Sequence, residues 1–204
     1  MLFDDTYQTI ETISEGIFRD KGSKFIGYAY PITSEAEVKV IIAELKAEHT
    51  KARHFCWALR LTPDRSVFKL NDDGEPSGTA GRPILNTLLS TDLTNILVVV
   101  VRYFGGTLLG VPGLINAYKS ATIAALNENK ISSKTVNDSY EFAFDYLTMN
   151  QIMRIIKEEN LKVLAQNFDT KCTIKVEIRK ANLNLVLSKI EKIEGINIIF
   201  IKTI

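Results

Sequence analysis

The sequence of 204 residues has few cysteines, few histidines and no long apolar run. Its two cysteines, Cys56 and Cys172, lie far apart and form neither a disulfide framework nor a metal-binding motif. The longest apolar run, residues 96–101, is far shorter than the roughly 18 residues that span a bilayer. The N-terminus lacks the basic start and apolar stretch of a secretory signal. We therefore expect a cytoplasmic protein that does not contact a membrane.

The chain also lacks an excess of either charge sign, with 25 basic and 24 acidic residues. Before residue 136 there are 15 of each, and from there onward 10 basic and 9 acidic residues. Proteins that bind duplexes without sequence preference need an excess of positive charge to neutralise phosphates. The composition therefore argues against broad duplex DNA binding but permits a local basic patch.

The length favours two domains, at about 150 residues per domain as a soft guide. The polar stretch 131–139 is interpreted as a linker, which predicts domains at 1–134 and 135–204. After the linker, the hydrophobic pattern alternates as β-α-β-β-α-β, which is typical of a ferredoxin-like domain. The predicted strands are 140–146, 162–168, 171–178 and 196–201, and the predicted helices are 150–159 and 183–193.

The first 134 residues predict a mixed α+β domain. Its two predicted hairpins comprise strands 8–17 and 23–30, and then residues 54–70. A capping-box pattern at Ser34 and Glu37 predicts a helix after the first hairpin, and a short helix is expected at 83–89. Residues 95–102 are apolar on both faces and predict a central strand. A glycine-rich turn then leads to a helix that begins near residue 114.

That turn, Arg102-Tyr103-Phe104-Gly105-Gly106 with Gly110 and Gly113 after it, is the most distinctive segment. Its glycines permit positive φ angles and close backbone approach, which suits an anion near the helix start, beside the positive charge of Arg102. The spacing matches neither the dinucleotide fingerprint nor the P-loop, so a tight structural turn is the alternative. Two adjacent aromatic residues on a turn cannot both enter one core, so one of them is available to bind a base or a partner protein.

A second polar segment, NDDGEPSGTAG, carries three carboxylates, Asp72, Asp73 and Glu75. These carboxylates could bind a hard cation or act in general acid–base catalysis, but the same residue types are also common in turns. The hydroxyls of Ser77 and Thr79 are nucleophiles only if a base lies nearby. His54 and Cys56 form either a catalytic dyad or a surface histidine beside a core cysteine, of which the second is favoured. The sequence predicts no bound cofactor or metal.

Four motifs in one order resemble the Impact/YigZ family: KGSKFIG at 21–27, RHFCWALR at 53–60, DDGEPSGTAGRPIL at 72–85 and VVVVRYFGGTLLG at 98–110. The resemblance covers essentially the whole chain. It implies an N-terminal βαβ domain with the fold of the second domain of a small-subunit ribosomal protein. The C-terminal domain would resemble a late domain of translation elongation factor G.

The resemblance also implies a role in translation, since eukaryotic relatives compete for an activator of the starvation-responsive initiation-factor kinase. The sequence contains no counterpart of the additional domain that those relatives carry, so that partner is not transferred. Family members often carry KLGAGGLIRAY after the double glycine. At the positions where this chain departs from that pattern it has Leu108, Val111-Pro112 and Asn116. The missing positive charges weaken phosphate binding and favour a protein or ribosomal surface, although Lys24, Arg82, Arg102 and Lys119 remain as substitutes.

We therefore expect a non-catalytic, monomeric regulatory protein that binds ribosome, RNA or a translation-related protein through the glycine-rich loops. The alternative is a metal-assisted hydrolase that uses Asp72, Asp73 or Glu75 with His54. A third interpretation is RNA binding by Tyr140, Phe142, Phe144 and Tyr146 on the C-terminal sheet, although their shared parity along the strand favours packing in a core. The predicted binding surface comprises Lys24, His54, Asp72, Asp73, Gly74, Glu75, Ser77, Gly78, Thr79, Arg82, Arg102, Tyr103, Phe104, Gly105, Gly106, Gly110 and Gly113.

Overall fold

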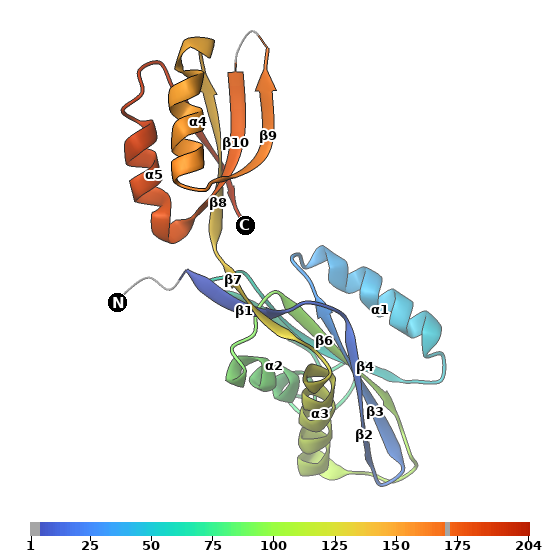
Figure 1. Ribbon diagram of the computed structural model, residues 1–204. Coiled ribbons are helices and arrows are strands. Elements are labelled where there is room, and N and C mark those ends of the chain that lie inside the picture. The colour runs from blue at the N-terminus through green and yellow to red at the C-terminus, as the bar shows by residue number, and fades with distance from the viewer. Residues whose placement is uncertain (1–4, 170–171) are drawn as a thin grey trace. The chain divides into compact units, whose positions relative to one another are not determined.

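The computed structural model describes residues 5–169 and 172–204, which form two compact units (Figure 1). One unit comprises Tyr7–Lys134, and the other comprises Thr135–Ile204 with the two described residues before Tyr7. Both units combine helices with β-sheets, so the predicted two-domain α+β class is confirmed. None of the described helices is both long and apolar enough to cross a membrane.

The N-terminal unit is built on a five-stranded sheet in which all neighbouring strands run antiparallel. The predicted central strand does lie in the middle of this sheet, and residues 96–102 are all buried. A run without polar alternation suits this place because both faces of the strand are covered. Across the sheet the order is β2 (Ser14–Asp20), β3 (Ser23–Pro31), β6 (Ile96–Tyr103), β4 (His54–Leu61) and β5 (Val67–Asn71).

Helices cover both faces of this sheet and divide the side chains of β6 between two cores. Even-numbered residues such as Val98 pack in the core that includes α2 (Gly81–Ser90) and α3 (Gly110–Asn127). Odd-numbered residues such as Val99 pack in the core that includes α1 (Ala36–Glu48). The side-chain period of two in a strand explains this division.

The α3 helix lies very close to the sheet. A Cβ atom at Gly27 of β3 would lie 2.4 Å from the carbonyl oxygen of Ala121, so only glycine allows this approach. The helix begins at Gly110, earlier than the predicted start near residue 114. Pro112 is tolerated there because the first turn of a helix does not use its N–H groups for internal hydrogen bonds.

Two predictions for the edges of this unit are wrong. The expected single strand 8–17 is divided into β1 (Thr6–Ile10) and β2, with residues 11–13 between them. The boundary between the two units lies inside the expected linker 131–139, but this segment is not irregular: it forms strand β7 (Ile131–Thr135) and the start of the next strand. β7 pairs with β1 in a separate two-stranded sheet. This pairing gives Ser132, Ser133 and Lys134 a neighbouring strand, which local sequence cannot reveal.

The C-terminal unit has the predicted β-α-β-β-α-β order, and its antiparallel sheet has the strand order β11-β8-β10-β9. Both α-helices lie against one face, as Figure 1 shows. The predicted strand start at residue 171 lies outside the described residues. The elements are β8 (Asn137–Phe144), α4 (Met149–Glu158), β9 (Lys162–Phe168), β10 (Cys172–Arg179), α5 (Leu183–Ile190) and β11 (Asn197–Thr203), with short 3₁₀ turns at Tyr146–Thr148 and Lys180–Asn182.

The four aromatic residues named as RNA-binding candidates do not form an exposed row on this sheet. Phe142 and Phe144 are buried in the core beneath the helices, and Tyr140 packs against Phe200 with ring centroids 5.5 Å apart. Tyr146 is exposed but lies in a 3₁₀ turn outside the sheet. Phe142 and Phe144 are therefore not available to an RNA ligand, whereas Phe168 and Phe200 of the same sheet are 40% and 53% exposed.

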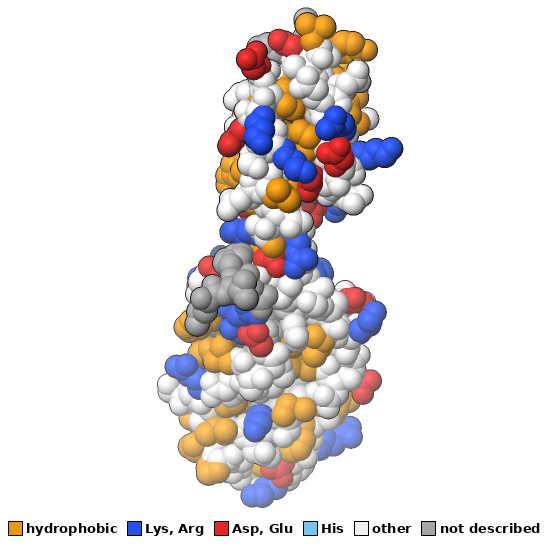
Figure 2. Space-filling view, turned by 60° about the vertical axis from the view of Figure 1, so that its left-hand side comes forward, with side chains coloured by type: hydrophobic (Ala, Val, Ile, Leu, Met, Phe, Trp, Pro, Cys, Tyr) orange, Lys and Arg blue, Asp and Glu red, His pale blue; other side chains and the backbone are white. Residues whose placement is uncertain are grey.

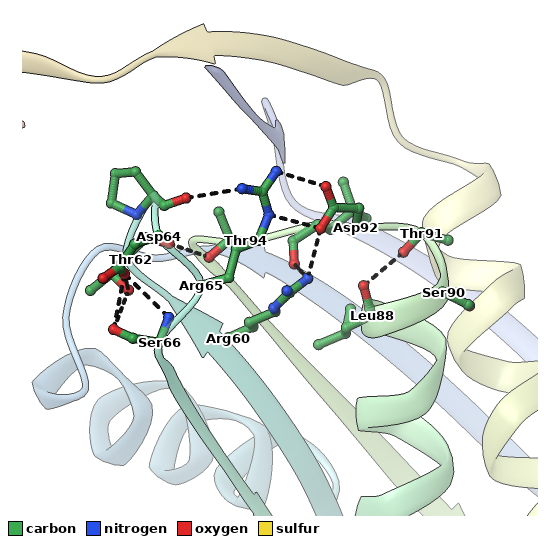
Figure 3. Close-up of polar contacts among 12 residues, drawn as sticks. Arg60, Thr62, Asp64, Arg65, Ser66, Leu88, Ser90, Thr91, Asp92 and Thr94 are labelled. Atoms are coloured by element: carbon green, nitrogen blue, oxygen red, sulfur yellow. Dashed lines mark hydrogen bonds and ion pairs between the residues drawn. The ribbon is translucent and has the colours of Figure 1, made fainter. Parts of the chain in front are cut away.

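A charged clamp closes the end of the N-terminal unit where the β4–β5 turn meets the loop before β6 (Figure 3). The Arg65 guanidinium donates from Nε and Nη2 to the two carboxylate oxygens of Asp92, at 2.8 and 2.7 Å. Arg60 Nη1 donates to the same carboxylate at 3.2 Å and to the Leu93 carbonyl at 3.3 Å. The hydrogen bonds from Arg65 are the main cause that holds the pKa of Asp92 below its ordinary value, and the hydrogen bond from Arg60 lowers it further. The clamp fixes a turn in which Thr62 and Arg65 both have positive φ.

We expect Asp92→Asn to lower the free energy of unfolding by about 1 kcal/mol at pH 7, since the Asp92 side chain is 54% exposed and solvent screens the pair. A lowered folded-state pKa contributes stability above the unfolded-state value near 4, and that contribution is lost as the pH falls through the folded-state value. Urea unfolding should therefore show that the difference in the free energy of unfolding between wild type and variant becomes smaller as the pH falls from 5 to about 3. The exposed α1 carboxyl variant Glu44→Gln is the control, and an equal difference at both pH values would contradict the prediction.

Candidate functional site

A pocket of about 670 Å³ opens in the N-terminal unit where the end of β6, the start of α3 and the β5–α2 loop meet. It brings together residues that are far apart in the sequence. Of the predicted binding surface, it is lined by His54, Gly74, Glu75, Arg102, Tyr103, Phe104 and Gly110. We call this the loop pocket.

The floor of the loop pocket contains a buried ion pair. Arg102 Nη1 donates to Glu75 Oε1 at 2.5 Å, and the side chains are only 6% and 4% exposed. The hydroxyl of Tyr118, from α3, donates to the same carboxylate oxygen at 2.8 Å. Burial is the main cause that raises the pKa of this hydroxyl, so it remains a neutral donor. Glu75 is therefore held by two elements of the fold.

The other two carboxylates of the acidic loop have structural partners of their own. Asp72 accepts from the backbone N–H groups of Gly78, Ala80 and Gly81, at 2.9, 3.1 and 2.8 Å, and so caps the start of α2. Asp73 Oδ2 accepts from the Phe55 N–H at 2.7 Å. The three carboxylates thus have separate partners, and no group of three or more His, Cys, Asp or Glu residues suited to hold a metal occurs in the part of the chain that the structure describes.

His54 and Cys56 do not form a catalytic pair. His54 Nδ1 lies 2.9 Å from the Asp73 carbonyl oxygen and donates to it, so Nε2 is the remaining ring nitrogen. The Cys56 sulfur lies 3.0 Å from the Asp72 carbonyl and 3.3 Å from the Tyr118 hydroxyl. Burial raises the pKa of the Cys56 thiol, and the nearby carboxylates raise it further. This is the core cysteine that the sequence favours.

We expect iodoacetamide at pH 8 to leave Cys56 unmodified in the native protein, because a buried thiol with a raised pKa supplies little reactive thiolate. Intact-mass measurement should show no addition after one hour, and additions at both cysteines once the chain is unfolded in guanidinium chloride. Rapid modification of the native protein at Cys56, located by peptide mapping, would contradict this assignment.

The side chains of Tyr103 and Phe104, the two aromatic residues of the glycine-rich turn, point in different directions, as expected. The Tyr103 hydroxyl lies 2.8 Å from His49 Nδ1, and His49 Nε2 lies 2.9 Å from the Tyr28 hydroxyl, which ties Tyr103 to the α1 side of the sheet. Phe104 is 52% exposed. The Arg102 guanidinium lies over its ring, with 5.4 Å between the guanidinium carbon Cζ and the ring centroid. Phe104 is therefore the aromatic residue available to a partner.

The glycines of the turn have different roles. Gly105 packs directly on the β2–β3 turn, because an added Cβ would lie 1.9 Å from the carbonyl carbon of Gly22. Its N–H donates to the Ser23 hydroxyl at 3.1 Å. Gly106 has a φ of +86° and no neighbour that an added Cβ would meet. At Gly113 an added Cβ would lie 2.9 Å from that of Leu109. The segment is thus both a structural turn and one wall of the pocket.

Several predicted residues lie outside the loop pocket. Gly78 and Arg82 line a second groove with Lys119, between α2 and α3. The Thr79 hydroxyl donates to the Pro76 carbonyl at 2.7 Å, and Ser77 is exposed. Lys24 stands opposite Tyr103 in the β3–β6 ladder. Arg82 and Lys119 are therefore not substitutes for the missing charges beside Arg102.

Sequence reasoning missed seven of the residues that line the pocket, among them two basic and two exposed apolar ones. Lys51 and Arg53 lie between α1 and β4, and Leu108 and Val111 lie at the start of α3. Arg53 opens a motif of the family resemblance, which was a usable signal. Leu108 drew notice only for the lysine that it replaces and Val111 only as a departure from the family pattern, although an exposed apolar residue is itself a binding signal.

Comparison with known proteins agrees with these motifs. The sequence profile of the Impact N-terminal domain matches residues 21–126. An IMPACT family member of Haemophilus influenzae is 33% identical over 174 residues, which cover 84% of this chain and 79% of that protein. A crystal structure of a hypothetical protein is 27% identical and superposes with a TM-score of 0.73, covering 97% of this chain and 98% of that one.

A structure described as the two-domain translational regulator Yih1 is 26% identical, and the match covers 63% of this chain and 49% of that chain. Its TM-score of 0.36 is too low to inform the fold. The profile match and the Haemophilus relative confirm the predicted resemblance. The chain therefore belongs to the Impact family.

Proposed function

We propose that this chain is a translation-associated regulatory protein that binds ribosome, RNA or a translation factor through the loop pocket. The observation that carries the proposal is the convergence of the RHFCWALR, DDGEPSGTAG and RYFGG segments on one pocket. The translation role is supported by membership of the Impact family and by the resemblance to relatives that regulate translation.

The chemistry of the pocket supports binding rather than catalysis. The carboxylates of Asp72, Asp73 and Glu75 already accept hydrogen bonds from the protein, so the metal-assisted hydrolase receives no support from their geometry. Exposed apolar side chains beside cationic ones are typical of an interface. On the face drawn in Figure 2, basic and acidic side chains are interspersed on each unit, which suits a local contact better than a broad duplex-binding surface.

The test is translation of a reporter messenger RNA in a bacterial cell extract, with parallel sedimentation of the chain with ribosomes at physiological salt. We expect wild type to change the reporter yield, and Phe104→Ser to reduce that change at least fivefold. Phe68→Ser is the matched control, because Phe68 on β5 is 54% exposed and Phe104 is 52% exposed. A wild-type protein that neither alters the yield nor sediments with ribosomes would refute the proposal.

A further inference from the structure

The loop pocket carries donor groups and apolar surface that the chain does not use itself. Lys51 and Arg53 are exposed, and neither forms an ion pair with any described residue. At the start of α3, Leu108 is 83% exposed and Val111 is 53% exposed. A pocket with free cations from one segment and bare apolar side chains from another suits a ligand that combines an anion with an apolar group.

The start of α3 also favours an anionic group in the pocket. The first turn of α3 contains no acidic residue, and no side chain caps it, so the amides at Gly110 and Val111 remain available. Arg102 lines the same pocket, but its side chain is only 6% exposed and its charge is paired with that of Glu75. Lys51 and Arg53 are therefore the cations of the pocket that an anionic ligand can reach.

A carboxylate on a protein suits this pocket better than a phosphate on a nucleic acid. Nucleic-acid sites combine several cations with aromatic faces on which bases stack. Here Phe104 is the one exposed aromatic residue among the described residues that line the pocket, and Leu108 stands where the family resemblance led us to expect a lysine. Apolar residues beside a few cations instead complement a peptide in which an acidic residue adjoins a large apolar one.

We propose that the loop pocket binds an acidic peptide segment of a protein partner, with a carboxylate on the Lys51–Arg53 side and an adjacent large apolar side chain against Leu108 and Val111. This inference rests on the proposed function and names the class of partner. The carboxylate receives charge-assisted hydrogen bonds, and the apolar side chain removes exposed surface from water.

The test is selection of a phage-displayed library of random 12-residue peptides against the full chain, followed by calorimetry with the synthetic form of the most enriched peptide. We expect enriched sequences to pair Asp or Glu with Leu, Ile, Phe or Trp. Arg53→Glu and Leu108→Ser should each weaken binding of that peptide at least tenfold. The matched controls are Lys39→Glu and Val40→Ser, both exposed positions on α1, and they should leave it unchanged.

Failure to enrich any peptide, enrichment of basic peptides, or binding that survives both pocket substitutions would overturn the inference. A 20-nucleotide oligouridine RNA forms the second arm: if it binds and loses its binding in Arg53→Glu while no acidic peptide does, the partner is a nucleic acid. Failure of this inference alone would leave the effect on translation in place, whereas failure of the proposed function would remove the effect on translation as well.

Discussion

Glu75→Ala is expected to destabilise the N-terminal unit by about 3 to 5 kcal/mol, the cost of leaving one member of a buried ion pair without its partner. The variant strands the Arg102 guanidinium, which is 6% exposed, and removes the acceptor of the Tyr118 hydroxyl. Urea unfolding of wild type and variant at pH 7.5 measures the difference.

The paired replacement Glu75→Leu with Arg102→Met distinguishes the ion pair from packing. Buried ion pairs exchanged for apolar residues of similar volume are often neutral in stability. We therefore expect the double variant to unfold closer to wild type than Glu75→Ala does. A loss below about 1 kcal/mol for Glu75→Ala would show that water enters the pocket floor and solvates Arg102.

Gly105→Ala is expected to cost about 3 kcal/mol or more, because overpacking against backbone atoms cannot be relieved by a side-chain rotation. The new Cβ would lie 1.9 Å from the carbonyl carbon of Gly22 and 2.2 Å from the nitrogen of Ser23. One of the two turns must then move, and the hydrogen bond from Gly105 to Ser23 is lost. Thermal unfolding followed by circular dichroism gives the change in Tm.

Gly106→Ala is the neighbouring control. Its added Cβ would meet nothing within 4 Å, so the cost is the strain of a φ of +86°, about 1 kcal/mol. If both variants lowered the Tm equally, the backbone conformation, rather than the contact with the β2–β3 turn, would explain why this segment needs glycine.

The fold was predictable where a pattern repeats along the chain. The run 96–101 identified the central strand, and the alternating helical and strand periods of the last 70 residues identified a ferredoxin-like order. The prediction failed at β7, whose polar residues become a strand only through pairing with β1, more than 120 residues earlier. Such long-range pairing leaves no local trace in the sequence.

The candidate site was predictable as a set of motifs but not as a set of partners. The sequence grouped Asp72, Asp73 and Glu75 because they are adjacent, whereas the structure separates them. The pair Arg102–Glu75 joins residues 27 positions apart, and no spacing rule predicts it. Leu108 was not chosen because its place beside Lys51 and Arg53 becomes visible only in the folded chain.

The double coverage of β6 has a consequence for how this chain tolerates sequence change. Between Ile96 and Val101 the strand has no exposed side chain, so every substitution there alters one of the two cores. Neutral drift is therefore confined to other strands. The edge strand β5 is exposed or half-buried along its whole length, and we expect relatives to diverge there far more than in β6.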